Sequence, residues 1–536
     1  MSQVKYIFVT GGVTSSLGKG IVSASLGMLL QARGYKVTIQ KLDPYINIDP
    51  GTLNPYEHGE CFVTEDGAET DMDLGHYERF LNDFTSQANN VTSGGIYQTV
   101  IEKERRGEYL GKTVQVIPHI TDEIKRRIQL LGSSNQYDII ITEIGGTVGD
   151  IECLPYIEAV RQLKWELGPA NSLVIHLTLL PFLNTTGELK TKPTQHSVRY
   201  LMESGIQADL LVCRSQEAVS GELRDKLALF CNVRSGRVFE SIDADTIYDV
   251  PELLFAQGFD QSVLSDLDLS HAVLPDLSIW QNFLRKYKNP KKEITIALVG
   301  KYINLHDAYK SINEALIHAG AYNEVRVKIR WIYSGGINEK NISKSFKDTL
   351  GIIVAPGFGK RGINGKILAV EYARNHKIPF LGICLGMQIA AVEFARNVLG
   401  IDAQSAEIYP NAEHPVIDLM EAQKVLTQKG GTMRLGAWSC SVEKNSLLWD
   451  IYAKEEISER HRHRYEFNSD YLEVFSRAGM KFSGVNPETG LIEAIELKGH
   501  PFFIGVQYHP EYKSMVANPH PLFIHFVKAA EAFLSK

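Results

Sequence analysis

Residues 6–20 read Tyr6-Ile-Phe-Val-Thr-Gly-Gly-Val-Thr-Ser-Ser-Leu-Gly-Lys-Gly20, an apolar run that ends in a glycine-rich loop. A periodic apolar stretch follows at residues 21–32, so we expect a strand, a loop and a helix in succession. The N–H groups of such a loop can hold phosphate oxygens, with Lys19 reaching the β- and γ-phosphates. The alternative is a glycine-rich turn without a ligand. We favour a nucleotide site because an acidic strand ending at Glu143 accompanies the loop.

The loop departs from the usual P-loop pattern at two points. Five residues instead of four separate its second glycine from Gly18, and Gly20 stands where a Ser or Thr normally contacts magnesium. We therefore expect carboxylates elsewhere to hold the metal. Glu143 is the first candidate, and Asp71 and Asp73 are the others, because magnesium needs only one or two carboxylates besides phosphates and waters.

Buried strands alternate with helical segments along the chain, which predicts an α/β fold with a doubly wound parallel sheet in the first half and a second α/β sheet after it. The expected strands of the first half are residues 6–10, 37–41, 137–143, 173–177 and 209–213. Those of the second half are residues 294–300, 352–354, 379–382 and 503–507.

The length of 536 residues is too great for one hydrophobic core. The alternating pattern breaks where Pro275 and Pro290 bracket a polar segment. We therefore predict a first domain at residues 1–267, a linker at 268–292 and a second domain at 293–536. We find no internal repeat and no low-complexity tract.

The composition of the chain limits the kinds of partner and compartment that we expect for it. A formal net charge of −7 argues against nucleic acid as the main partner, because phosphate neutralisation needs a basic surface. The six cysteines form no CxxC pair, which argues against a structural zinc site and favours a reducing compartment. No apolar run is long enough to span a bilayer, and the first ten residues show no leader pattern. We expect a cytoplasmic enzyme.

A cysteine form of the nucleophile elbow occurs in Phe380-Leu-Gly-Ile-Cys-Leu-Gly-Met-Gln388. Glycines two residues either side of Cys384 permit a strained turn and a close backbone approach. A helical stretch at 388–398 follows, and its N-terminus lowers the pKa of a thiol and supplies N–H groups for an oxyanion. Gly357 and Gly359, after the strand at 352–354, are candidates for the other side of that oxyanion site.

A base and an orienting group for the thiol occur together in Gln507-Tyr-His-Pro-Glu511. In extended conformation His509 and Glu511 project to one side, so the carboxylate can orient an imidazole aimed at Cys384. The alternatives are a buried structural thiol and a surface histidine. The elbow and the His-Pro-Glu run together favour catalysis.

The segment Lys190-Thr-Lys-Pro-Thr-Gln-His196 gathers two lysines, two threonines and a glutamine. Pro193 keeps this segment out of a helix interior, and such a loop suits a second phosphorylated ligand. A solvated basic loop is an equal alternative. The spacing of residues 150–152 and of Lys226 permits no interpretation.

These motifs resemble known families. The Cys384 elbow and the His509-Pro-Glu511 run resemble a class I glutamine amidotransferase. Five segments resemble CTP synthase nearly end to end, namely Gly11 to Gly20, Lys41-Leu-Asp-Pro-Tyr-Ile-Asn47, Glu65-Asp-Gly-Ala-Glu-Thr-Asp-Met-Asp73, Glu143-Ile-Gly-Gly-Thr-Val-Gly-Asp-Ile-Glu152 and Lys190 to Gln195.

The resemblance implies a set of site residues beyond the catalytic Cys384, His509 and Glu511. ATP would contact Ser16, Leu17, Gly18, Lys19, Gly20, Ile21, Asp73, Ile242, Asp243 and Ala244, with Lys41 nearby. UTP or the inhibitor CTP would contact Ser15, Asp150, Ile151, Glu152, Lys190, Thr191, Lys192, Pro193, Thr194, Gln195 and Lys226. Glutamine would contact Gly357, Leu385, Gly386, Met387, Gln388, Glu407 and Arg464, and Asp73 and Glu143 would hold Mg²⁺.

The resemblance also implies a reaction. The first domain would phosphorylate the 4-oxygen of UTP with Mg-ATP, and ammonia would displace the phosphate to give CTP. The second domain would release that ammonia from glutamine and pass it through an internal tunnel. GTP would activate glutamine hydrolysis, and the chains would form homotetramers and filaments.

One segment departs from the family pattern. The family usually has Pro-Gly-Gly-Phe-Gly where this chain has Ala355-Pro-Gly-Phe-Gly359. Gly357 is kept, so the oxyanion donor is expected to be intact, while the shifted proline changes the preceding backbone.

Two alternatives stay open from the sequence. One is another P-loop synthetase with a glutaminase domain, such as a cobyrinate-type amidotransferase. The other is a nucleotide-switched assembly protein with a degenerate glutaminase domain, although all three triad candidates are present.

Overall fold

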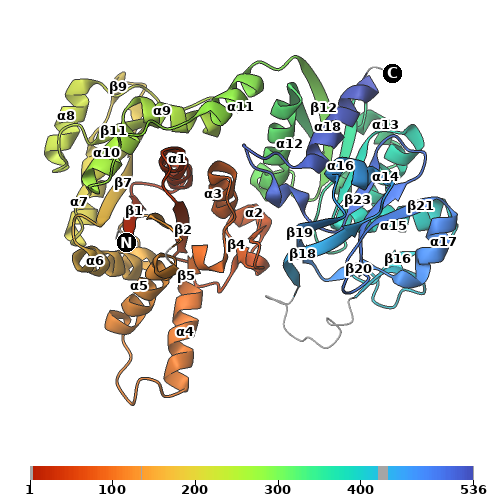
Figure 1. The fold of residues 1–536 in the computed structure, drawn as a ribbon, viewed down its shortest axis with the longest axis horizontal. Helices are drawn as coiled ribbons and strands as arrows, with labels where there is room; N and C mark the ends of the chain where they lie inside the picture. Colours follow the sequence, from red (N-terminus) through yellow and green to blue (C-terminus); the bar gives the residue numbers. More distant parts are fainter. Residues whose placement is uncertain (1–3, 135, 420–432, 535–536) are drawn as a thin grey trace. The chain divides into compact units, whose positions relative to one another are not determined.

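The computed structural model describes residues 4–134, 136–419 and 433–534. The chain divides into two compact units (Figure 1). The first consists of Met1–Pro50 and Asp73–Ile279, and the second of Gly51–Met72 and Trp280–Lys536. Helix α11 (Ser278–Lys288) lies inside the predicted linker. The predicted domain boundaries at 267 and 293 stay predictions.

The first unit contains a seven-stranded sheet in the order β11-β10-β7-β1-β6-β2-β5, and every pairing in it is parallel. The order reverses around β1, as in a doubly wound fold, so the predicted parallel sheet is confirmed. Its strands are β1 (Lys5–Gly11), β2 (Val37–Asp43), β5 (Asn90–Thr92), β6 (Ile139–Ile144), β7 (Ser172–Leu180), β10 (Leu210–Ser215) and β11 (Val238–Ile242).

Helices cover both faces of this sheet, as Figure 1 shows for α1 on one side and for α5 and α6 on the other. Alternate residues of β1 face the two layers; Tyr6 and Phe8 pack into the core under α5 and α6. The helices are α1 (Lys19–Ala32), α3 (Asp73–Leu81), α4 (Ser93–Arg105), α5 (Thr121–Leu130), α6 (Leu154–Leu167), α7 (Lys192–Glu203), α8 (Gly221–Phe230), α9 (Val250–Ala256) and α10 (Phe259–Asp266).

The second unit is built on a nine-stranded sheet in the order β13-β12-β14-β15-β23-β22-β21-β18-β19. The strands from β13 to β23 pair in parallel, and those from β23 to β19 are antiparallel. The strands are β12 (Lys292–Gly300), β13 (Val325–Tyr333), β14 (Gly351–Val354), β15 (Phe380–Ile383), β18 (Arg434–Val442), β19 (Glu456–His463), β21 (Met480–Val485), β22 (Ile492–Leu497) and β23 (Phe503–Val506).

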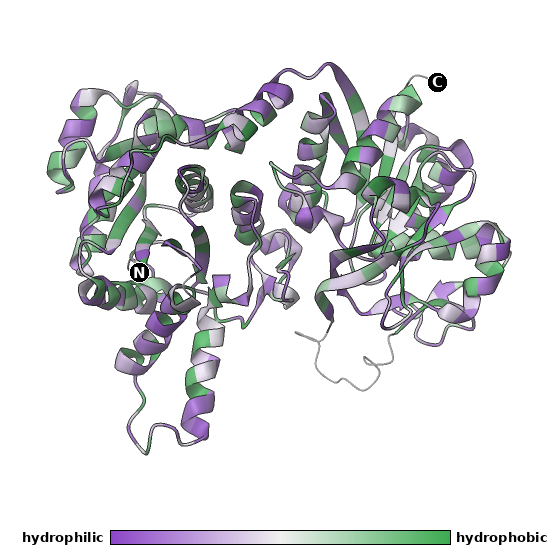
Figure 2. Cartoon of the chain, viewed as in Figure 1, coloured by the Kyte–Doolittle hydropathy of each residue, from purple (hydrophilic) through white to green (hydrophobic). Residues whose placement is uncertain are grey.

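Two hydrophobic cores fill the faces of this mixed sheet. One lies under α14 (Ile363–His376) and α15 (Leu385–Asn397), and the other under α12 (Lys310–Tyr322) and α18 (Pro521–Leu534). Figure 2 shows hydrophobic residues gathered on the strands and hydrophilic ones on outward-facing helix surfaces. A smaller sheet joins β16 (Gln404–Ser405), β17 (Pro415–Leu419) and β20 (Tyr465–Phe467).

The segment Gly51–Met72 folds with the second unit although it precedes most of the first unit in sequence. It contains β3 (Phe62–Val63) and β4 (Glu69–Thr70), which pair with each other. Glu65 lies 2.9 Å from Nε of Arg460, and Glu69 lies 2.8 Å from the guanidinium of Arg462. Both arginines belong to β19, so ion pairs hold this segment against the sheet.

No helix within the described ranges is long and apolar enough to cross a membrane. All six cysteines lie in the described ranges and are unpaired with one another.

Candidate active sites

Cys384 lies in the elbow between β15 and α15, with φ 52° and ψ −105°. This conformation is strained for a residue with a side chain and is typical of functional turns. A Cβ on Gly386 would lie 2.1 Å from the carbonyl oxygen of Val354, and one on Gly382 would lie 2.7 Å from the backbone of Gly386. Both glycines therefore permit the close backbone packing that the sequence predicts.

The other two predicted catalytic side chains lie beside the thiol. Nδ1 of His509 is 2.7 Å from Oε1 of Glu511, and both residues are almost fully buried. Burial opposes the charged imidazole, but the negative charges of Glu511 and Cys384 outweigh it and raise the pKa of His509 to about 10. Glu511 occupies Nδ1, and a hydrogen bond with the Cys384 thiol also raises the pKa of His509, so Nε2 is the nitrogen that serves the thiol and its substrate.

Gln507 is a residue of this site to which the sequence interpretation gave no role. Its Nε2 donates to Sγ of Cys384 at 3.5 Å, and its Oε1 accepts from Nε2 of Gln388 at 3.1 Å. Gln388, expected to contact glutamine, also donates to the carbonyl of Tyr465 at 2.7 Å. The available signal was its position in the Gln507-Tyr-His-Pro-Glu511 run, two residues before His509 and therefore on the same side of an extended chain.

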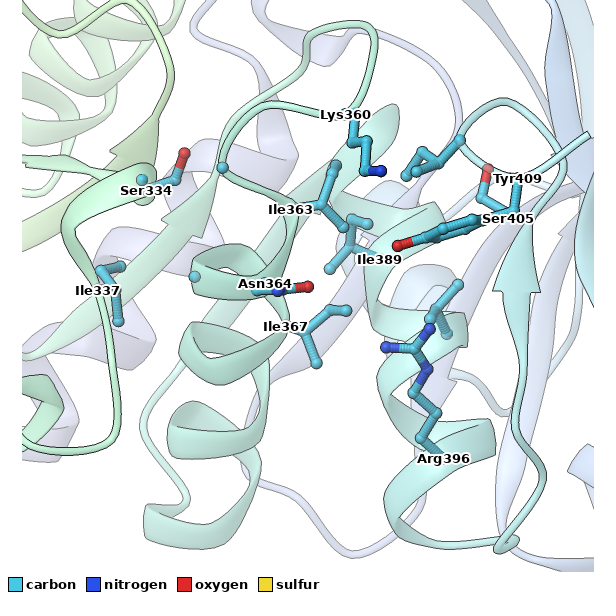
Figure 3. Close-up of a pocket in the computed structure, with 15 residues that line it drawn as sticks. Ser334, Ile337, Lys360, Ile363, Asn364, Ile367, Ile389, Arg396, Ser405 and Tyr409 are labelled. Atoms are coloured by element: carbon cyan, nitrogen blue, oxygen red, sulfur yellow. The ribbon is translucent and has the colours of Figure 1, made fainter.

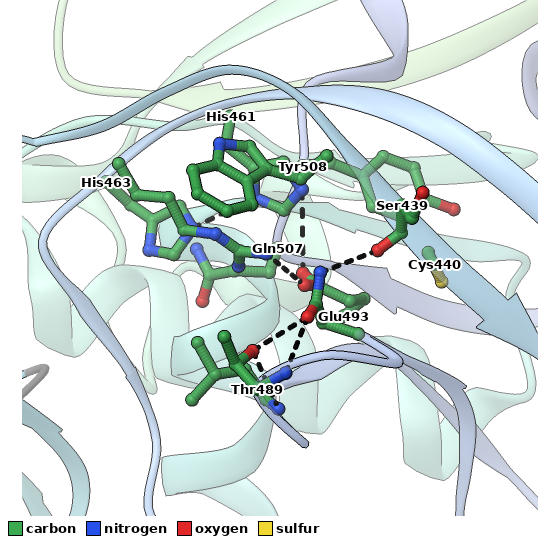
Figure 4. Close-up of polar contacts among 12 residues, drawn as sticks. Ser439, Cys440, His461, His463, Thr489, Glu493, Gln507 and Tyr508 are labelled. Carbon is green, nitrogen blue, oxygen red and sulfur yellow. Dashed lines mark hydrogen bonds and ion pairs between the residues drawn. The ribbon is translucent and has the colours of Figure 1, made fainter.

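Gln507 lies beside a buried network of polar side chains (Figure 4). Nδ1 of His461 and Nε2 of His463 are 2.9 Å apart, and Arg434 donates to Glu493 at 2.6 Å. Burial, together with nearby positive charge, holds the pKa of both histidines well below the usual range. The backbone N–H of Gln507 donates to the carbonyl of Glu493 in β22 at 2.8 Å, which fixes the chain just after β23, two residues before His509.

The residues predicted to hold glutamine surround the elbow. Leu385, Gly386 and Met387 form the first turn of α15, and Gly357 follows β14 with φ +151°, a conformation that favours glycine. Oε1 of Glu407 accepts from the N–H of Gly359 at 2.5 Å. Arg464 lies between β19 and β20. Their roles in binding glutamine stay predictions.

A separate pocket of about 340 Å³ lies between α14 and α15 (Figure 3). Isoleucines including Ile363 and Ile389 form its walls, and Lys360, Arg396 and Tyr409 add polar groups. None of the residues predicted for a site lines it.

In the first unit, the loop after β1 has the conformation of an anion-binding nest. Val13, Ser16 and Gly18 have φ of 78°, 59° and 90°. Alternation of left-handed residues turns successive N–H groups toward one point. Lys19 folds back over Gly11, and its Nζ donates to the carbonyl of Gly146 at 2.7 Å. The role of this loop in holding phosphate stays a prediction.

The two carboxylates predicted for magnesium meet at the start of α1. Nζ of Lys41 donates to Asp73 and lies 3.1 Å from Oε1 of Glu143. A Cβ on Gly20 would lie 2.7 Å from Oδ1 of Asp73, so the glycine leaves room for these carboxylates. Burial disfavours the charge of Asp73, but Lys41 outweighs it and lowers the pKa of Asp73. Two clustered hard oxygen donors suit Mg²⁺ that keeps waters and phosphates.

A buried histidine supports the phosphate loop from beneath. The ring nitrogens of His176 lie 2.8 Å from Oγ1 of Thr10 and 2.7 Å from Oγ of Ser197. Burial, and then Lys19, lower the pKa of His176 to about 3. A Cβ on Gly12 would collide with Ser197, so the loop after β1 packs directly against the side chains of this network.

The expectation that Lys190 to Gln195 form a loop is wrong in part. Helix α7 begins at Lys192, with Pro193 in its first turn. A proline is tolerated there because the first N–H groups of a helix have no intrahelical acceptor. Thr191 and Thr194 are buried, whereas Lys190 and Lys226 both lie close enough to Glu188 to lower its pKa, Lys190 mainly through a hydrogen bond.

The remaining predicted nucleotide residues lie at the same edge of the sheet, where parallel strands end. Asp150, Ile151 and Glu152 are exposed and follow β6. Ile242 ends β11, and Asp243 and Ala244 come next, with Asp243 accepting from Arg214 at 2.5 Å. Ser15 is exposed in the loop after β1.

The thiol elbow and the His-Pro-Glu run, set on a mixed α/β sheet, define a class I glutamine amidotransferase. Comparison with known families agrees, because residues 304–529 match the family described as glutamine amidotransferase class-I. Residues 5–269 match the family described as CTP synthase N-terminus.

Relatives cover the whole chain. A CTP synthase of Flavobacterium psychrophilum is 68% identical over 531 residues, covering 99% of each chain. One of Bacteroides fragilis is 58% identical, also covering 99% of each chain. A solved Trypanosoma brucei CTPS glutaminase domain with bound acivicin is 37% identical, covers 45% of this chain and 94% of that chain, and has a TM-score of 0.42. This chain belongs to the CTP synthase family and is a glutamine-hydrolysing carbon–nitrogen ligase.

Proposed function

We propose that this chain makes CTP from UTP, with ATP activating the pyrimidine and glutamine or ammonia supplying the nitrogen. Family membership over the full length supports this reaction. The observation that carries the glutamine half is the grouping of Cys384, His509 and Glu511 at one strained elbow. We infer a cytoplasmic enzyme.

In the glutaminase site, the Cys384 thiolate attacks the side-chain amide carbon of glutamine and forms a thioester. His509 transfers a proton to the leaving nitrogen, and ammonia departs. Water then attacks the thioester with His509 as base, which releases glutamate and restores the thiolate. Glu511 holds the Nδ1 proton, so Nε2 faces the reacting atoms. Gly357, Leu385, Gly386, Met387, Gln388, Glu407 and Arg464 hold the glutamine.

In the synthetase site, the 4-oxygen of UTP takes the γ-phosphoryl group of ATP. This step turns a poor leaving group into phosphate, which ammonia displaces to give CTP. The nest at residues 13–18 and Lys19 hold the ATP phosphates, with Ile242, Asp243 and Ala244 at adenine. Asp73 and Glu143 would hold Mg²⁺, which supplies charge neutralisation between the phosphates when bound.

The pyrimidine nucleotide, as substrate UTP or as inhibitor CTP, contacts Ser15, the 150–152 turn, the start of α7 and Lys226. The exposure of residues 150–152 and the proximity of Lys190 and Lys226 to one carboxylate support this assignment. Ammonia from the second unit travels inside the protein, because free ammonia in water is mostly protonated. GTP activates glutamine hydrolysis, and the chain assembles as a homotetramer that can form filaments.

One variant tests whether glutamine hydrolysis and CTP synthesis take place at separate sites. Cys384→Ala is expected to abolish glutamine-dependent CTP synthesis and to leave ammonia-dependent synthesis near the wild-type rate. The conversion of UTP to CTP is followed by absorbance with each nitrogen source. A Cys384→Ala protein that still uses glutamine, or one that fails with ammonia despite normal folding, contradicts the proposal.

A further inference from the structure

The loop at residues 355–359, which follows β14 and contains Gly357, rests on two buried lysines. Lys301 is 1% exposed and Lys366 is 0% exposed. Such burial is costly for an amine unless hydrogen bonds compensate. Among the residues that the structure describes, no carboxylate lies within 4.0 Å of either amine, so the compensation comes from elsewhere.

Both amines donate to carbonyl groups of this loop. Nζ of Lys366 donates to the carbonyl of Ala355, and Nζ of Lys301 donates to those of Phe358 and Gly359. The stem of Lys301 also runs along Gly357, because a Cβ there would lie 3.7 Å from Cδ of Lys301. Three of the five loop carbonyls are thus turned toward lysine amines.

The bound carbonyls belong to the planar peptide groups 355–356, 358–359 and 359–360. The N–H groups of Gly357 and Phe358 belong to the two peptide groups between these, which are therefore held at both ends. The N–H of Gly359 donates to Glu407, and Pro356 has no N–H. The N–H groups of Gly357 and Phe358 donate to no residue of the described ranges, so they are the amides available to a substrate oxygen.

Burial lowers the pKa of Lys301 to about 8 and that of Lys366 well below its usual value. The contacts that both amines make with this loop are hydrogen bonds to its carbonyl groups. Replacing either lysine by a neutral donor should therefore retain much of its effect.

We propose that Lys301 and Lys366 are positioning residues, which hold loop 355–359 so that the amides of Gly357 and Phe358 meet the oxyanion formed when Cys384 attacks glutamine. This inference rests on the proposed role of Cys384. Neither lysine touches the reacting atoms.

The test compares Met and Gln variants at both positions in the full-length enzyme. Lys301→Met and Lys366→Met are expected to lower kcat for glutamine hydrolysis about 10- to 100-fold, somewhat less than the loss of one oxyanion donor, with little change in KM. Lys301→Gln and Lys366→Gln are expected to recover a substantial part of that loss. Lys360 is an exposed lysine in the same connection between β14 and α14. Lys360→Met is therefore the matched control and should keep wild-type kcat.

Alkylation of Cys384 by iodoacetamide separates positioning from other effects, because this reaction needs the thiolate but no oxyanion site. The Met variants are expected to be alkylated within about twofold of the wild-type rate. Unchanged kcat in the Met variants, or a parallel loss of kcat and alkylation, overturns the proposal. Cys384→Ala tests the proposed function separately, because residual glutaminase activity there would overturn the role of the thiol itself.

Discussion

Nδ1 of His509 lies 2.7 Å from Oε1 of Glu511, with both side chains removed from solvent. This contact holds the imidazole with Nε2 toward Cys384 and stabilises its protonated form. Glu511→Gln keeps the shape of the side chain, but its amide N–H can donate to Nδ1 of His509. This contact favours the tautomer with its proton on Nε2, which cannot accept a proton from the thiol. Glutamine hydrolysis is expected to fall by about 10²- to 10⁴-fold, as in comparable triads. Ammonia-dependent synthesis is the internal control; equal losses with both nitrogen sources would assign Glu511 a structural role only.

Gly20→Ala tests the carboxylate cluster. The new Cβ would lie 2.7 Å from Oδ1 of Asp73, so this carboxylate must shift, whereas 3.5 Å to Oε2 of Glu143 is an ordinary contact. We expect ATP-dependent synthesis with ammonia to fall at least tenfold, while glutaminase activity is retained. Gly221→Ala is the control, because that glycine starts α8 and a Cβ there meets nothing within 4 Å. Normal synthesis by Gly20→Ala would exclude a role for this cluster.

The ion pair of Glu65 with Arg460 should contribute to the stability of the second unit. The guanidinium of Arg460 is 0% exposed and also donates to the carbonyl of Val63 at 2.9 Å. Glu65→Gln weakens a charge-assisted hydrogen bond and is expected to cost about 1–3 kcal/mol, a loss of several degrees in Tm. Glu473→Gln breaks an exposed pair with Arg477 and should change stability by less than about 0.5 kcal/mol. Equal Tm values for the two variants would contradict the assignment of residues 51–72 to this unit.

Buried His176 should make the first unit sensitive to acid. Its folded pKa of about 3 lies below the unfolded value near 6.5, so below pH 6.5 the unfolded chain binds the proton and the folded unit does not. The contribution of His176 to the free energy of unfolding is complete above pH 6.5. It is lost at about 1.4 kcal/mol per pH unit as the pH falls toward 3.

The comparison is His176→Gln, which keeps hydrogen bonding to Thr10 and Ser197 without titrating. Its Tm should fall less steeply than that of the wild type between pH 7 and pH 5. His196→Gln, on the exposed side of α7, should follow the wild-type slope. Identical slopes for all three proteins would show that His176 is not the sensitive group.

Local patterns predicted much of this molecule. The strand at 6–10, the glycine loop and the following helix were recognisable because apolar periodicity and glycine spacing lie in one continuous stretch. The thiol elbow was recognisable for the same reason. The strained φ of Cys384 and the backbone contacts of Gly382 and Gly386 explain why those residue types occur at those positions.

Long-range pairing was not predictable in the same way. Strands β18, β19, β21 and β22 pair antiparallel beyond β23 and are not among the strands expected from the sequence. The contacts of Lys301 depend on residues more than fifty positions away, so no local spacing indicates them. For Gln507 the spacing to His509 indicates the side of the chain, but not the contact with Cys384. Pro193 favours a loop in the sequence pattern, but the first turn of a helix accepts proline, so α7 begins at Lys192.

The placement of Gly51–Met72 has a mechanical consequence. The backbone passes from one unit to the other after Pro50, after Met72 and after Ile279. A protease nick inside residues 268–292 would therefore leave the two pieces tethered, since a length of the N-terminal piece is ion-paired into the sheet of the other. Such a nicked enzyme is expected to migrate as one particle in its native state and as two bands after denaturation. A single cut within residues 268–292 is therefore not expected to separate the two fragments, because Gly51–Met72 of the N-terminal fragment folds with the second unit.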